Sequence, residues 1–70
     1  MTDDELREFQ VRPFQPFRIW LSGGELVDIT REFQIAVMPK QFAAAVNEKL
    51  KFFPLSRVER VERVLPVQST

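Results

Sequence analysis

The residue types in this sequence exclude most of the usual catalytic arrangements. The chain contains no histidine and no cysteine, so the commonest general acid–base residue and the thiol nucleophile are both absent. Ser22 and Ser56 have no neighbouring base that the sequence identifies. Gly23 and Gly24 are typical of a hairpin turn and do not belong to a phosphate-binding Gly-x-x-x-x-Gly-Lys loop. We therefore predict that the protein is not an enzyme and has no catalytic residues.

The sequence also lacks the side chains of common metal and cofactor sites. A chain without cysteine cannot form disulfide bonds, and without histidine and cysteine it lacks the usual zinc ligand sets. Its carboxylates lie close in sequence to arginine or lysine, which is typical of surface ion pairs. We predict no metal and no cofactor.

Three arginines near the C-terminus are the candidates for contact with nucleic acid. Arg57, Arg60 and Arg63 repeat every third residue, a spacing that a phosphate-binding stripe could use. Glu59 and Glu62 are interleaved with them, so the segment neutralises its own charge. The sequence therefore favours a solvated strand here, with nucleic-acid binding as the alternative.

Three large apolar residues, Trp20, Leu26 and Phe52, are the candidates for an interaction surface. Trp20 and Leu26 face away from the core in the hairpin register derived below. Phe52 and Phe53 are adjacent, and a strand directs neighbouring side chains to opposite faces. The N-terminal helix or another subunit must cover these side chains. We predict self-association through the Trp20 side, because aromatic residues are enriched at the cores of interfaces.

Length and charge indicate one small domain. The 70 residues divide into an acidic helical leader over 1–12 and a β body over 13–70. Residues 1–10 carry four acids and one base, and residues 11–70 carry nine bases and six acids, so the charges are −3 and +3. This balance is too even for a dedicated nucleic-acid binder. The acidic start is no signal peptide, and no apolar run approaches the roughly 20 residues of a membrane span. We expect a cytoplasmic protein.

The leader and the first hairpin have the clearest local signals. Thr2 followed by Glu5 forms a capping box that starts a short helix. Strands are predicted at 17–21 and 25–30, joined by a three-residue loop at 22–24. That loop places Arg18 opposite Asp28 and Ile19 opposite Val27. A two-residue loop would instead place Asp28 on the core face, and the hydrophobic pattern rejects it. Gly24 then takes the left-handed position of the turn.

Two later segments leave alternatives open. Residues 41–46 (QFAAAV) have three alanines that favour a helix, but the segment is short and a hairpin signal at Asn47 follows, so we favour a strand. Another strand contains Phe52 and Phe53 and stops at Pro54. Residues 57–65 could form a helix, since Ser56 and Glu59 match a capping box. We favour a 3₁₀ turn at 54–57 and a strand over 59–65.

The N-terminal half of the chain resembles a known group of proteins. The segment PFQPFRIWLSGG at 13–24, followed by VDI at 27–29 and IAV at 35–37, is similar to short uncharacterised bacterial proteins that are common in planctomycetes. These proteins carry a PFxPFRIxLSxG hairpin. Their His-Pro pair falls at Arg31 and Glu32 and is missing here. This resemblance implies no function.

A more remote resemblance concerns architecture. A short helix before five short strands, with FRIWLSGG at 17–24, FQIAV at 33–37 and FFPLSRV at 52–58, is similar to the Sm-like and SH3-like small β-barrels. Sm-like proteins bind RNA as rings. Their diagnostic Asn and Arg-Gly loop residues have no counterparts at matching positions here. The resemblance therefore implies the architecture and not the RNA site.

These observations lead to one reading with one alternative, and a small enzyme or enzyme subunit is a third option. We expect a mostly β fold, namely a small five-stranded SH3-like or Sm-like barrel with a short N-terminal helix. We expect a non-enzymatic interaction module that forms homo-oligomers or binds another protein. The alternative is a weak RNA binder of the Sm-like type. Neither a nucleic-acid partner nor a membrane is expected.

Overall fold

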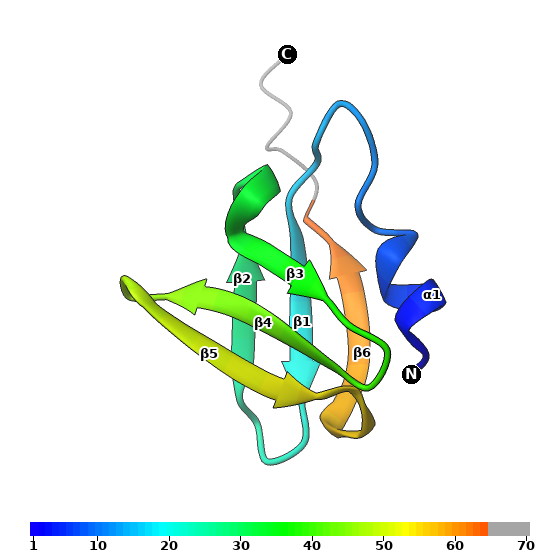
Figure 1. Cartoon of the computed structure of the whole chain (residues 1–70), viewed down its shortest axis with the longest axis vertical. Coiled ribbons are helices and arrows are strands. Elements are labelled where there is room, and N and C mark those ends of the chain that lie inside the picture. Colours follow the sequence, from blue (N-terminus) through cyan, green and yellow to red (C-terminus); the bar gives the residue numbers. More distant parts are fainter. Residues whose placement is uncertain (65–70) are drawn as a thin grey trace.

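Six short strands form two three-stranded antiparallel sheets, preceded by one short helix (Figure 1). The computed structural model describes residues 1–64. The first sheet has the order β2-β1-β6 and the second the order β3-β4-β5. The elements in chain order are α1 (Asp3–Arg7), β1 (Phe17–Leu21), β2 (Leu26–Ile29), the 3₁₀ turn η1 (Glu32–Gln34), β3 (Ile35–Val37), β4 (Gln41–Val46), β5 (Lys49–Pro54), η2 (Leu55–Arg57) and β6 (Val58–Arg63). The predicted mostly β fold with a short N-terminal helix is confirmed. The structure adds β3 to the expected strands, because residues 35–37 pair with β4.

The predicted capping box starts α1. The Thr2 hydroxyl accepts a hydrogen bond from the Glu5 amide at 3.2 Å, and the Glu5 carboxylate accepts one from the Thr2 amide at 2.9 Å. The bond from the Thr2 amide holds the pKa of the Glu5 carboxyl below its usual value. Leu6 is fully buried, and Arg7 donates to the carbonyl of Val37 in β3 at 3.1 Å. The helix is therefore fixed at both ends although it has only five residues.

The first hairpin has the predicted register. Arg18 lies opposite Asp28 and Ile19 lies opposite Val27, so the alternative register with a two-residue loop is wrong. Ile19 is fully buried and Val27 is 2% exposed, which is the physical reason for this register. Arg18 donates to Asp28 across the outer face at 2.7 Å. Gly24 has a φ of +85°, the left-handed conformation that the turn required.

Residues 41–46 form a strand, as predicted. The segment pairs with β3 on one side and β5 on the other, and these hydrogen bonds outweigh the helix propensity of its alanines. Asn47 and Glu48 make the turn to β5 with φ of +51° and +66°. Phe42 and Phe53 lie opposite each other, and their rings stack at 5.2 Å between centroids.

The C-terminal segment forms η2 and a strand, so the alternative prediction of a helix over 57–65 is wrong. The strand spans Val58–Arg63, where 59–65 was predicted, and residue 65 lies outside the described residues. Its register against β1 shifts between Trp20 and Leu21, which pair with Arg60 and Val58. This bulge passes over residue 59, so Val58 and Val61 both turn to the core although they are three residues apart.

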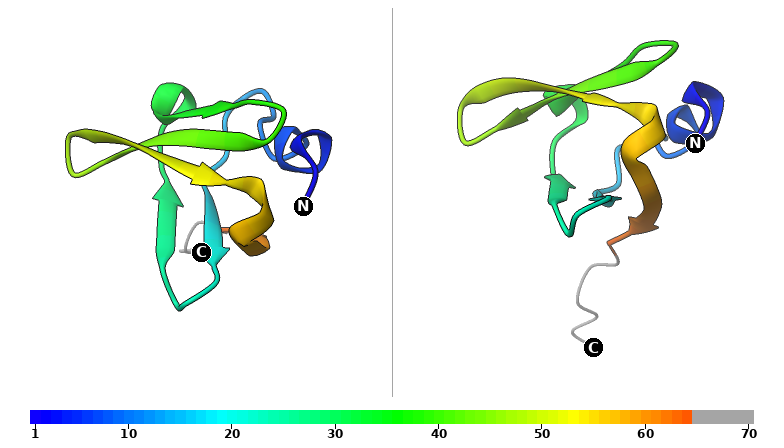
Figure 2. Two further views of the ribbon diagram at one scale, coloured as in Figure 1. Left: turned by 60° about the horizontal axis from the view of Figure 1, so that its bottom comes forward. Right: turned by 90° about the horizontal axis from the view of Figure 1, so that it is seen from below.

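The inner faces of the two sheets share one hydrophobic core. Figure 2 shows the second sheet lying across the first, with α1 at one end and the β4–β5 hairpin tip at the other. The buried residues come from both sheets, α1 and η2: Leu6, Phe17, Ile19, Leu21, Val27, Ile29, Ile35, Phe42, Ala44, Phe53, Leu55 and Val58.

One polar side chain connects the two sheets at their corner. The Gln34 amide nitrogen donates to the carbonyl of Asp28 in β2 at 2.8 Å and to that of Ala45 in β4 at 2.9 Å. Its amide oxygen accepts from the Thr30 amide at 2.8 Å. Gln34 therefore fixes the angle at which the chain leaves the first sheet and enters the second.

We predict that Gln34→Ala lowers the free energy of unfolding by about 1–3 kcal/mol, because it leaves backbone groups at the corner without partners. Urea denaturation measures the change. Gln41→Ala is the matched control, since the Gln41 side chain is exposed and its one side-chain hydrogen bond within residues 1–64 goes to the Met38 sulfur, at 3.8 Å. Equal stability of the two variants would contradict the role given to Gln34.

Candidate functional site

The candidate surfaces of this protein differ in what their residues could bind. Across residues 1–64 no three acidic side chains come close enough to hold a metal ion. No helix in this part of the chain is long and apolar enough to cross a membrane. The exposed side chains of the two sheets and the turns form several distinct surfaces.

Trp20 and Leu26 lie together on the outer face of the first sheet, as the register required. The Trp20 indole donates to the Glu62 carboxylate at 2.5 Å, and the Arg60 guanidinium lies over the ring at 4.9 Å. A cation in this position is attracted by the ring electrons. Leu26 is 38% exposed. Trp20 is therefore partly covered by its own chain, a role that was expected for α1 or another subunit.

The three C-terminal arginines do not share one face. Arg57 forms an ion pair with Glu25 at 3.1 Å beside the hairpin loop. Arg60 lies over Trp20 on the outer face. Arg63 is on the opposite face of β6, where it donates to the carbonyl of Phe9 at 3.1 Å. To form a continuous phosphate-binding stripe, the three arginines would have to break these contacts.

The outer face of the second sheet carries the larger apolar surface. Leu50 and Phe52 lie two residues apart on the outer face of β5, and they are 63% and 56% exposed. Phe53 points to the core instead and is 5% exposed. The register places Phe52 opposite Ala43 and Leu50 opposite Ala45. We call these four residues, Ala43, Ala45, Leu50 and Phe52, the β4–β5 apolar face. Leu50 and Phe52 form the exposed part of this face, since Ala43 is buried and Ala45 is half-buried.

β5 is also the edge strand of its sheet. Among residues 1–64, no strand pairs with the side of β5 that faces away from β4. Its two lysines, Lys49 and Lys51, are exposed and form no ion pair within this part of the chain. Lysine on an edge strand opposes open-ended addition of further strands. The edge therefore permits contact with a partner and disfavours fibre growth.

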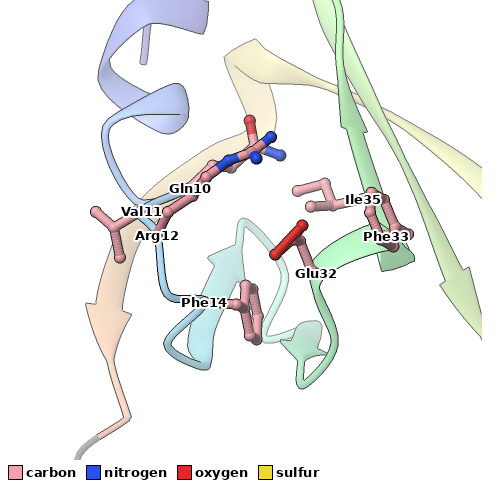
Figure 3. A pocket seen from close by; sticks show the side chains of 7 residues that line it. All are labelled: Gln10, Val11, Arg12, Phe14, Glu32, Phe33 and Ile35. Carbon is pink, nitrogen blue, oxygen red and sulfur yellow. The ribbon is translucent and has the colours of Figure 1, made fainter.

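A further surface was missed by sequence reasoning. A cleft of about 300 Å³ lies between the turn η1 and the connector, the segment 8–16 that joins α1 to β1 (Figure 3). Its walls are residues 10–12 and Phe14 on one side, and Glu32, Phe33 and Ile35 on the other. Phe33 is 91% exposed. The sequence indicates a turn at 31–33, and nothing in it distinguishes an exposed phenylalanine from a buried one.

Comparison of the chain with protein-family models, curated proteins and solved structures gives no match in any of the three. The function must therefore be argued from the surfaces of this molecule.

We predict that Arg60→Gln exposes Trp20, because it removes the cation over the indole ring. Trp20 is the single tryptophan, so its fluorescence reports on this site alone. The expected results are stronger acrylamide quenching and a loss of about 0.5–1 kcal/mol in stability. Arg57→Gln serves as the control because Arg57 pairs with Glu25 instead. Identical quenching of both variants would show that Arg60 does not cover the ring.

Proposed function

We propose that this chain is a non-enzymatic interaction module that self-associates through the β4–β5 apolar face. The observation that carries the proposal is the exposure of Leu50 and Phe52 together on one face of an edge strand. Large apolar side chains grouped on a surface are typical of protein interfaces. A cytoplasmic location is part of the proposal, since a cysteine-free domain does not depend on an oxidising compartment.

We also propose that the two sheets are the halves of one five-stranded barrel of the SH3-like or Sm-like kind. In this proposal β2 and β3 are a single strand that bends at η1 and takes part in both sheets. The hydrogen bonds from Gln34 to carbonyls of β2 and β4 support it, because they keep these two strands together at the bend. The short turn η2 supports it at the other corner, where β5 leads directly into β6.

The size of the domain favours association. A chain of this length buries only about 60% of its unfolded surface, so its stability margin is small. Complete burial of a leucine or phenylalanine contributes about 1.5–3 kcal/mol. Leu50 and Phe52 are each more than half exposed in the single chain. A second copy packed on this face would recover much of that energy for both molecules.

The shape of the face fits a second copy of itself. Leu50 and Phe52 are the exposed part of this face, since Ala43 is only 3% exposed, so a two-fold arrangement packs Leu50 and Phe52 of one copy against those of the other. Such an interface uses the same patch on both subunits. The Trp20 and Leu26 side remains a second, smaller surface in this proposal, since Arg60 already lies over the indole ring.

We predict that the wild-type chain is a concentration-dependent oligomer in analytical ultracentrifugation. Phe52→Ser should weaken association about tenfold, which corresponds to about 1.4 kcal/mol per interface. Phe33→Ser is the matched control, because Phe33 is even more exposed but lies outside the face. A wild type that stays monomeric up to high micromolar concentration would end the proposal. Equal dissociation by both variants would place the interface elsewhere.

A further inference from the structure

Five of the seven arginines are already held by groups of this chain. These are Arg7, Arg18, Arg57, Arg60 and Arg63, which contact carboxylates, carbonyls or aromatic rings. Arg12 and Arg31 make no such contact within residues 1–64. Their guanidinium groups therefore have full hydrogen-bonding capacity for a ligand.

Each of these arginines lines a concave surface that also includes the exposed Phe33. Arg12 lines the cleft between the connector and η1 (Figure 3). Arg31 lines the adjoining hollow, which shares Glu32 and Phe33 with the cleft. Phe33 is thus bordered on two sides by concave surface, and a cationic side chain belongs to each. The hollow beside Arg31 reaches Ala45 of the β4–β5 apolar face, whereas the cleft beside Arg12 contains no residue of that face.

We propose that this cleft binds an acidic peptide segment that carries one large apolar side chain between carboxylates. The cleft holds about 300 Å³ and is lined by Phe14, Phe33 and Ile35, which suits one such side chain. Arg12 in the cleft and Arg31 in the adjoining hollow supply the charge that carboxylates on the flanking residues require. The planar guanidinium group matches a carboxylate with two parallel hydrogen bonds.

Glu32 determines where the negative charges of the ligand can lie. Its side chain points from η1 into the space facing the connector (Figure 3). A carboxylate at the centre of the cleft would be repelled by Glu32, so the centre is left for the apolar group. The same residue disfavours a nucleic-acid backbone, since Arg12, Arg31 and Glu32 together amount to only one net positive charge.

The test uses the full chain and a fluorescein-labelled peptide with the core Glu-Asp-Phe-Asp-Glu, followed by fluorescence anisotropy. We expect saturable binding that weakens as salt is raised. Arg12→Gln and Arg31→Gln should each weaken binding about threefold to fivefold, as for an exposed ion pair. Glu32→Gln should strengthen it by a similar factor. Phe33→Ser should weaken it at every salt concentration.

Arg60→Gln is the control, because Arg60 lies over Trp20 and away from the cleft, and circular dichroism checks that each variant is folded. A peptide with serine in place of its phenylalanine should bind less tightly. Absence of saturable binding would overturn the proposal, as would weaker binding by Glu32→Gln. Tighter binding of an oligothymidylate than of the peptide would show that the cleft is a nucleic-acid site instead.

Discussion

The two sheets share a single core, and this constraint decides which side chains are left at the surface. Every strand directs alternate residues to opposite faces, so each sheet has an outer face that the common core cannot cover. Gln34 fixes the corner between the sheets by donating to carbonyls of β2 and β4. The only helix among residues 1–64 has five residues and lies beside β3, where Leu6 joins the core. Within residues 1–64, no further helix or sheet packs on the outer face of either sheet.

The outer faces of the two sheets differ in how far their apolar side chains are covered. On the first sheet, Arg18 pairs with Asp28, and Trp20 lies beneath Arg60, so charged groups of the same chain partly cover the aromatic ring. On the second sheet, Leu50 and Phe52 have no comparable cover. This difference is why we locate self-association on β5. The cleft beside Phe33 is a third surface, formed where the connector and η1 meet, and its unused arginines suit a different kind of partner.

Local signals in the sequence predicted much of the fold. The register of the first hairpin followed from its hydrophobic pattern, and the capping box at Thr2 followed from residue spacing. The cover over Trp20 could not be predicted, because it depends on the pairing of β6 with the distant strand β1, which places Arg60 opposite Trp20. The exposure of Phe33 depends on how η1 sits between two sheets, which no local pattern encodes. The alternation in β5 did indicate that Phe52 and Phe53 face opposite ways, and the structure shows which of them is buried.

The central claim is that a second copy covers the β4–β5 apolar face. A dilution series of ¹H–¹⁵N NMR spectra tests it residue by residue on the unmodified chain. The account predicts that the amide signals of Ala43, Ala45, Leu50 and Phe52 shift with concentration, while those of Leu26 and Phe33 stay constant. Spectra that do not change with concentration, or shifts confined to the Leu26 side, would contradict it.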